Sequence, residues 1–120
     1  MAAFYHKKSQ SQDEDGHAFH IELNAQHPVY EGHFPGQPVA PGVMLTRMIQ
    51  ELTEEISGSK LFLAEARSIK FLKFVDPTAT PTLDVHIQLI PDEEVVKINS
   101  RADFEGATYF KLNATFNKIS

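Results

Sequence analysis

Much of the sequence alternates apolar and polar residues one by one, the period of β-strands that bury a single face. Residues 83–89, 96–104 and 110–116 carry this pattern in the second half, and residues 19–23 carry it nearer the N-terminus. Residues 61–75 contain two further possible strand pieces. Short turn signals separate the last three series, so we expect these strands to be antiparallel neighbours.

One segment, residues 43–57, follows the helical period instead. Leu45, Ile49 and Leu52 recur at four- and three-residue steps and belong to one apolar stripe, and Gly58 follows as a natural stop. A sheet with one apolar face can bury that face by wrapping around such a helix. The patterns therefore predict an α+β fold in which a five- to six-stranded antiparallel sheet wraps around one central helix.

Composition limits both the size of the fold and its partners. The 120 residues suffice for one domain with a real core, and no run of about eighteen apolar residues predicts a membrane span. The net charge of −5 argues against nucleic acid as a partner. The absence of cysteine excludes thiolate catalysis and thiolate metal sites, and it is compatible with the cytoplasmic location that we expect.

The N-terminal segment has a different character. Residues 1–16 are polar and include an acidic cluster, which predicts a mobile or weakly paired arm ahead of a single domain over residues 17–120. This start lacks the apolar block of a signal peptide. His17 and His20 follow and are expected to face solvent. No carboxylate spacing joins them to a metal site, so none is predicted.

The densest cluster of glycine and proline leads into the predicted helix. Residues 32–42 read Gly-His-Phe-Pro-Gly-Gln-Pro-Val-Ala-Pro-Gly and hold three of the six glycines and three of the seven prolines. Such a path is stiff and closely folded, and it carries one histidine, His33. Pro41 and Gly42 then open the helix, where free N–H groups and the positive end of the dipole can stabilise an anion. A proton-transfer group near such a helix end is the skeleton of a catalytic site.

Residues 32–43 match the signature G-H-F-P-G-x-P-x-x-P-G-V at every specified position, and here the chain resembles the 3-hydroxyacyl-(acyl carrier protein) dehydratases of the hot-dog fold. A softer similarity covers residues 69–77. The resemblance implies the hot-dog fold and the removal of water from a 3-hydroxyacyl thioester, giving a trans-2-enoyl thioester in fatty-acid-like or polyene synthesis.

The resemblance also implies roles for two motif residues. The motif histidine, His33, would be the base that takes the α-proton, and an unperturbed imidazole pKa of ~6.5 suits that task. The backbone N–H of Gly42 would face the thioester carbonyl as an oxyanion-hole donor. A structural histidine that satisfies turn carbonyls is the simpler alternative for His33.

One position departs from the family. A carboxylate is expected fourteen residues after the histidine, and this sequence has Arg47 there. A guanidinium stays protonated and cannot act as an acid–base group. In a first account the catalytic carboxylate has moved one helical turn, to Glu51, which could equally form an ordinary i, i+4 pair with Arg47. In a second account His33 works alone. In a third the chain is a catalytically silent hot-dog subunit beside an active paralogue.

Further residues are expected to contact the substrate or its carrier. The predicted substrate-binding residues are Phe34, Val43, Met44, Arg47 and Met48, with Arg47 able to hold a carboxylate or phosphate, including that of a phosphopantetheine arm. Acyl carrier proteins are acidic, so the basic group Arg67, Lys70 and Lys73 is a candidate docking surface, although ordinary surface charge would look the same. No cofactor is predicted beyond the phosphopantetheine that carries the substrate.

The resemblance further implies a homodimer in which two sheets join edge to edge, with possible assembly into higher oligomers or a heterodimer with a paralogue. The site would then combine residues of two subunits. Two other functions compete with dehydration. One is a hot-dog thioesterase, in which Glu51 would activate water, and the other is the silent partner subunit that Arg47 suggests.

Overall fold

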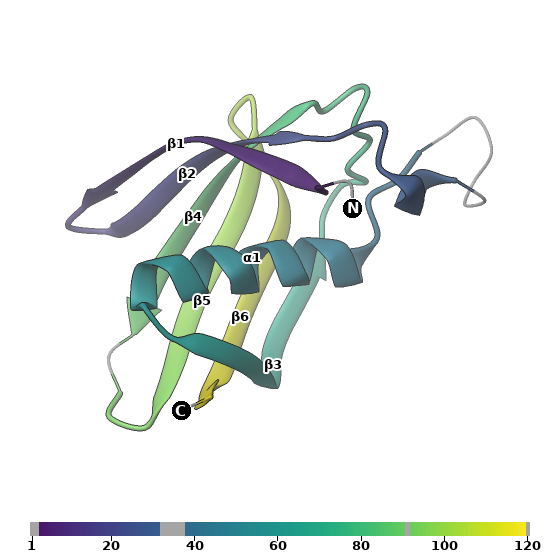
Figure 1. Ribbon diagram of the computed structural model, residues 1–120. Helices are drawn as coiled ribbons and strands as arrows, with labels where there is room; N and C mark the ends of the chain where they lie inside the picture. Colours follow the sequence, from purple (N-terminus) through teal and green to yellow (C-terminus); the bar gives the residue numbers. More distant parts are fainter. Residues whose placement is uncertain (1–2, 32–37, 91, 120) are drawn as a thin grey trace.

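The computed structural model describes residues 3–31, 38–90 and 92–119 (Figure 1). Its strands are β1 (Tyr5–Asp13), β2 (Gly16–Leu23), β3 (Lys60–Phe71), β4 (Thr82–Ile90), β5 (Val95–Phe104) and β6 (Ala107–Ile119); a 3₁₀ turn, η1, spans Pro28–Tyr30, and helix α1 spans Gly42–Ser57. The six strands form one antiparallel sheet in the order β1-β2-β4-β5-β6-β3. The predicted six-stranded antiparallel sheet is confirmed.

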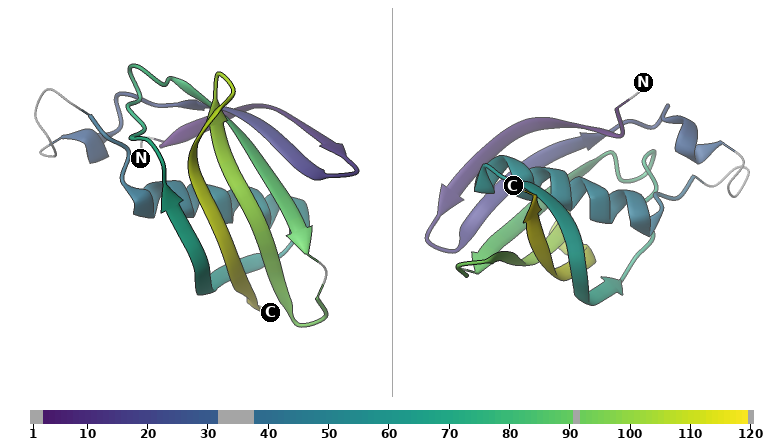
Figure 2. Two further views of the ribbon diagram at one scale, coloured as in Figure 1. Left: turned by 180° about the vertical axis from the view of Figure 1, so that it is seen from behind. Right: turned by 60° about the horizontal axis from the view of Figure 1, so that its bottom comes forward.

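Helix α1 lies across the inner face of the curved sheet, and the view from behind shows the outer face, with α1 on the far side of the sheet (Figures 1 and 2). Leu45, Ile49 and Leu52 are buried against the sheet, as the apolar stripe predicts. The helix begins after Pro41, whose φ of −65° suits the cap position, and ends at Gly58 with φ +70°. The fold is thus a sheet wrapped around one helix.

The alternating runs lie where they were expected. In β4, Leu83, Val85 and Ile87 are buried, and the same alternation continues across β5 and β6. Glu105 and Gly106 have φ of +50° and +81° and make the tight turn between β5 and β6. The hairpin predictions are confirmed.

Strand β3 is one continuous edge strand where the sequence suggested two pieces. Its pairing with β6 shifts register between Leu63 and Glu65 and again between Ala66 and Ser68. Each shift is a β-bulge, which inserts an extra residue and breaks the alternation. The bulges explain why the pattern in this region reads as interrupted.

The structure corrects the expected N-terminal arm. Residues 5–13 form β1, which pairs with β2 from Tyr5–Leu23 to Asp13–Gly16. Most of β1 is exposed on both faces, so it has no apolar alternation to detect. Buried Phe4 and an ion pair from Lys7 Nζ to Glu55 Oε1 at 3.0 Å fix the strand beside α1. The domain therefore includes residues that the sequence assigned to an arm.

Within the described ranges, α1 is neither long nor apolar enough to cross a bilayer.

Candidate functional site

The start of α1 presents backbone donors as predicted. The N–H groups of Met44 and Leu45 donate to the carbonyl oxygen of Pro41 at 3.0 and 3.2 Å. Gly42 and Val43 precede them in the first turn, where N–H groups have no acceptor within the helix. Pro41, the residue at the cap position, makes no side-chain capping hydrogen bond. The first turn therefore offers N–H groups and the positive end of the helix dipole to an anionic or polarised oxygen.

Gly42 lies against the ring of Phe71, at the end of β3. A Cβ atom at position 42 would come within 2.6 Å of Phe71 Cε1 and closer still to Cζ, so only glycine fits beside the ring in this position. Phe71 in turn packs on Phe110, with ring centroids 5.1 Å apart. Sequence reasoning missed Phe71 as a site neighbour, although it lies in the stretch of softer family similarity.

A groove between β1 and α1 brings four predicted site residues together. Met44, Arg47, Met48 and Glu51 line it from the helix, and the cavity measures about 640 Å³. Its other walls come from the N-terminal segment and from the turn after β2, through residues 3–7 and His27, and Glu55 closes its far end. The volume lies within the usual range for small-molecule sites.

The charged pair in this groove is largely open to solvent. Arg47 Nε lies 3.8 Å from Glu51 Oε2, and the two side chains are 74% and 47% exposed. An exposed i, i+4 pair of this kind contributes only a few tenths of a kcal/mol. Glu51 is therefore held weakly by Arg47.

Tyr5 is a groove residue that sequence reasoning missed. Burial, and after it the negative charge of Glu51, raise the pKa of the Tyr5 hydroxyl above its ordinary range. The hydroxyl thus stays a neutral hydrogen-bond donor next to the Glu51 carboxylate. Tyr5 was assigned to the N-terminal arm, and only the pairing of β1 with β2 brings it to the helix.

Two predicted residues, His33 and Phe34, lie outside the described residues. The described chain on either side is anchored: Tyr30 N donates to His27 O at 3.2 Å, and Ala40 N donates to Val75 O at 2.7 Å. The Tyr30 hydroxyl oxygen is buried and has no hydrogen-bond partner within the described ranges. Burial, with a smaller effect of Asp76, raises the pKa of Tyr30 to about 12.

The predicted docking residues fall on and after β3. Lys70 pairs with Lys111 of β6, which in turn pairs with Arg101 of β5, so a basic row crosses three strands of the outer face. Lys73 Nζ lies 5.4 Å from the centroid of the Tyr109 ring. Arg67 Nη2 donates to the carbonyl oxygen of Ile98 at 3.3 Å.

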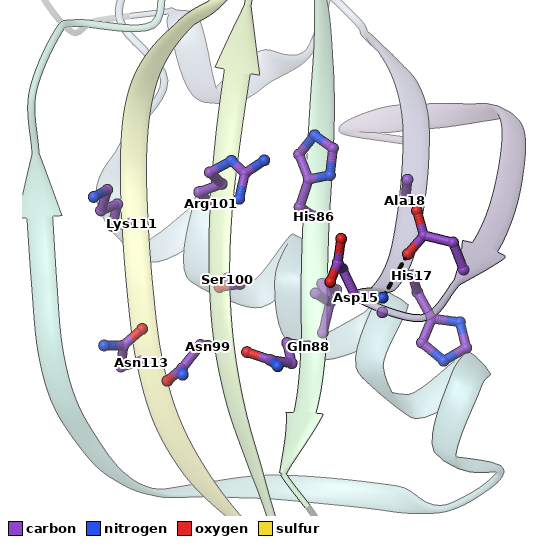
Figure 3. Close-up of a pocket in the computed structure, with 13 residues that line it drawn as sticks. Asp15, His17, Ala18, His86, Gln88, Asn99, Ser100, Arg101, Lys111 and Asn113 are labelled. Atoms are coloured by element: carbon purple, nitrogen blue, oxygen red, sulfur yellow. Dashed lines mark hydrogen bonds between the residues drawn. The ribbon is translucent and has the colours of Figure 1, made fainter.

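The basic row borders a polar depression on the outer face of about 590 Å³ (Figure 3). Figure 3 shows Lys111, Arg101 and His86 side by side across neighbouring strands. Arg101 is partly neutralised, because its Nε donates to Asp103 Oδ2 at 3.0 Å. Neither Gly42 nor Glu51, the predicted catalytic residues within the described ranges, lines this depression.

In the part of the chain that the structure describes, one α-helix, the six-stranded antiparallel sheet around it and the open helix N-terminus define an α+β protein of the hot-dog class. A family model for ApeI-like proteins, described as ApeI dehydratase, matches residues 8–112. The chain therefore belongs to the ApeI-like dehydratase family.

Curated relatives agree with this assignment. The 3-hydroxyacyl-(acyl-carrier-protein) dehydratase FabZ of Staphylococcus saprophyticus is 28% identical over 102 residues, which cover 79% of this chain and 70% of the relative. The FabZ proteins of Lactiplantibacillus plantarum and Clostridium perfringens are each 31% identical, over 51% and 68% of this chain. The matched segments span only 45% and 58% of these two relatives.

Solved structures support the fold. A chain of the dehydratase heterocomplex ApeI:P from Xenorhabdus doucetiae matches with a TM-score of 0.74 at 17% identity, over 92% of this chain and 96% of that one. The BH2602 protein from Bacillus halodurans, solved with CoA, matches with a TM-score of 0.63 at 11% identity, over 93% of this chain and 74% of that one. The predicted hot-dog fold is confirmed.

Proposed function

We propose that this protein removes water from a 3-hydroxyacyl thioester carried on an acyl carrier protein, giving the trans-2-enoyl thioester. The observation that carries the proposal is the family match over residues 8–112, which includes the whole Gly-His-Phe-Pro-Gly motif. The open N-terminus of α1 and the groove beside it supply a site of suitable size. A cytoplasmic location stays a prediction from the sequence.

In the proposed reaction, His33 takes the α-proton of the substrate, and the electron pair of the broken C–H bond forms the new C=C bond. The backbone N–H of Gly42 stabilises the negative charge that grows on the thioester oxygen; a donor of this kind is worth about 10²–10³ in rate. His33 passes the α-proton to the Glu51 carboxylate, and Glu51 gives it to the hydroxyl as the C–O bond breaks, so that the group departs as water. One proton has then moved from Cα to the leaving oxygen, and both His33 and Glu51 are back in their starting states.

The groove walls suggest how the substrate is held. Met44 and Met48 provide flexible apolar surface for an acyl chain, with Met48 buried at the groove floor. Arg47 is 74% exposed at the rim, where its guanidinium can bind the phosphate of a phosphopantetheine arm. Phe34 and Val43 complete the proposed substrate contacts.

The proposed docking surface for the carrier protein is Arg67, Lys70 and Lys73, extended by Lys111. An acidic carrier protein complements this basic group in charge. The protein as a whole carries a net charge of −5, so this local group of positive charges contrasts with the rest of the chain.

We also propose that the protein forms an edge-to-edge homodimer through β3. The sheet has two edge strands, and they differ in character. Strand β1 presents mainly polar residues, whereas β3 exposes Phe62, Ile69 and Phe71 at 47%, 42% and 60%. A long edge strand with exposed apolar side chains is a site for pairing with another strand.

The experiment incubates the purified chain with a 3-hydroxyacyl carrier protein and follows both the enoyl product and free acid. We expect enoyl product without free acid, and we expect His33→Ala to abolish it. Free acid would identify a thioesterase instead, and neither product would identify an inactive subunit. Because an unfolded variant would also be inactive, circular dichroism and oligomeric state of His33→Ala must match the wild type.

Arg47 favours a second candidate function. It occupies the position where the resemblance implies a carboxylate, so the chain could serve as a silent subunit that completes its site with an active paralogue. Restoration of dehydration only after such a paralogue is added would support this alternative over the homodimer.

A further inference from the structure

We propose that Tyr5 is a positioning residue for Glu51: its phenol hydroxyl donates to the Glu51 carboxylate and holds this group in the groove between β1 and α1. The inference rests on the proposed function, in which Glu51 relays the proton from His33 to the leaving hydroxyl, and it adds the residue that orients the relay group. Three features carry it: the face of β1 on which Tyr5 lies, the alignment of β1 with α1, and the burial of the phenol.

The first residues of β1 direct every second side chain toward α1. Tyr5 pairs with Leu23 of β2, which is buried on the inner face of the sheet. Two positions on, Lys7 pairs with Ile21, which is buried on the same face. Opposite residues on neighbouring strands point to the same face. Tyr5 and Lys7 therefore lie on the face that α1 covers, whereas the exposed His6 between them points away.

Strand β1 and helix α1 also advance side by side, and both run from right to left in Figure 1. Two residues of a strand span about 6.6 Å, and four residues of a helix span about 6 Å. A contact between Lys7 and Glu55 therefore sets Tyr5, two residues earlier, beside Glu51, four residues earlier. That contact is present, because Lys7 Nζ lies 3.0 Å from Glu55 Oε1. Tyr5 and Glu51 line the same groove.

Burial makes Tyr5 a fixed and neutral donor. Tyr5 is half-buried and packs against the hydrophobic core. Burial raises the pKa of its hydroxyl, and the charge of Glu51 and a hydrogen bond to Glu51 raise this pKa further, ahead of Glu55 and Glu54. A phenol that keeps its proton can donate to a carboxylate without exchanging protons with it. Tyr5 therefore orients Glu51 and takes no part in the proton relay itself.

Arg47 is a weaker anchor for the same carboxylate. Its Nε lies 3.8 Å from Glu51 Oε2, beyond hydrogen-bond distance, and 74% of its side chain is exposed. An exposed pair of this kind is screened by salt and loses side-chain entropy when it forms. A carboxylate has about four acceptor sites, so a hydrogen bond from Tyr5 leaves others free for the proton and the leaving hydroxyl. Tyr5 is therefore the contact that limits the orientation of Glu51.

The first test detects the contact without any substrate. The chain has three tyrosines, and phenolate absorbance is followed as the pH rises, over the range in which circular dichroism shows a folded protein. In Glu51→Gln the negative charge beside Tyr5 is lost, so one tyrosine should ionise at lower pH than in the wild type. Tyr5→Phe/Glu51→Gln should lack this group, which assigns it to Tyr5. Glu55→Gln should shift the same group less, because Glu55 has a smaller effect on the pKa of Tyr5.

The second test measures turnover of a short 3-hydroxyacyl pantetheine thioester. Tyr5→Phe keeps the ring and removes only the hydroxyl, and it should lower kcat by roughly tenfold with KM unchanged, because a misplacement of about 1 Å can cost about 10²-fold. In the Glu51→Gln background the same substitution should change kcat by less than about twofold, since its effect passes through Glu51. Tyr109→Phe removes the same atom outside the groove and should keep kcat. Circular dichroism and oligomeric state of each variant must match the wild type.

The outcomes separate this inference from the proposed function. An unchanged tyrosine titration in Glu51→Gln would overturn the contact, whatever the activity of the protein. If the wild type is active but Tyr5→Phe keeps its kcat, raises KM alone or loses activity equally in both backgrounds, the positioning role is overturned and the dehydratase proposal stands. A wild type that forms no enoyl product would overturn the proposed function and the role of Tyr5 in it, even where the titration shows the contact.

Discussion

The ring of Phe71 fills the space that a side chain at Gly42 would need, with 2.6 Å between Phe71 Cε1 and the position of a Cβ atom on residue 42. Gly42 is the first residue of α1 and Phe71 is the last residue of β3, so this contact joins the proposed oxyanion donor to the proposed dimer edge. The position of the helix end therefore depends on how β3 is held. Pairing of β3 with a second copy would hold both.

The contact predicts that Gly42→Ala destabilises the folded protein, although replacing a helical glycine by alanine usually stabilises a protein by restricting the unfolded chain. Overpacking of this kind typically costs about 1–3 kcal/mol, and relief by displacement of the helix end would move the Gly42 N–H. We expect a lower free energy of unfolding in denaturant titrations and slower dehydration. Phe71→Ala should remove most of the penalty of Gly42→Ala in a double-mutant cycle. Additive effects of the two substitutions would mean that the ring is not the obstacle.

The N-terminal segment should contribute to the free energy of unfolding, although its sequence pattern predicted a mobile or weakly paired arm. Phe4 is 8% exposed and packs on His27 and Tyr30, with ring centroids 5.7 and 6.4 Å apart. Phe4→Ala should lower the free energy of unfolding by about 3 kcal/mol, near the lower end for a buried phenylalanine. The matched control, His6→Ala, alters an exposed residue two positions on and should change it by less than about 0.5 kcal/mol. If Phe4→Ala were as stable as His6→Ala, the N-terminal segment would contribute little to the free energy of unfolding.

The elements that were predicted correctly are those whose burial leaves a local period in the sequence. The residues that were missed reach the site only through the arrangement of the strands in the sheet. The stripe of Leu45, Ile49 and Leu52 was enough to place α1, because burial on one face leaves a 3.6-residue period. Strand β1 left no such period, because both its faces are largely exposed. Tyr5 and Phe71 reach the site from strands distant in sequence, and their positions depend on strand order, which periodicity does not specify.

The raised pKa of Tyr30 predicts that the free energy of unfolding decreases at alkaline pH. The folded-state pKa of about 12 lies above the ordinary value of ~10, so the neutral hydroxyl is favoured in the folded protein. The stabilisation is complete below pH ~10 and is lost as the pH rises toward 12, because the unfolded chain ionises first. Tyr30→Phe should flatten the fall of the free energy of unfolding in this window, and phenolate absorbance should lose one late-titrating group. Tyr109→Phe, which removes the hydroxyl of a tyrosine in β6 whose ring lies beside Lys73, serves as the control.

The docking proposal predicts a charge effect on substrate binding. Lys73→Glu should raise KM for a carrier-protein substrate several-fold, with little change in kcat, because it acts on encounter and not on the reacting atoms. The same variant should leave KM unchanged with a short pantetheine thioester, which has no protein surface to dock. An equal rise in KM with both substrates would place Lys73 in the acyl site instead.

The resemblance implies an acid–base carboxylate at the position of Arg47, so the proton donor in the proposed reaction has to be another residue. Glu51, one helical turn later, is the candidate. If Glu51 supplies the proton, Glu51→Gln should lower kcat by about 10²–10⁴, the usual loss for a general acid. Glu55→Gln is the matched control, since Glu55 lines the same groove one turn later but pairs with Lys7. It should retain kcat within about two-fold, because a residue outside the acid–base step adds little to it.

A second variant distinguishes a moved carboxylate from a lone histidine. In Arg47→Glu/Glu51→Gln the carboxylate returns to the position fourteen residues after His33, and we expect activity to recover at least tenfold over Glu51→Gln, since the helix keeps its backbone donors. Both variants are compared with the wild type at saturating substrate and equal dimer content. Undiminished activity of Glu51→Gln would instead assign both proton transfers to His33.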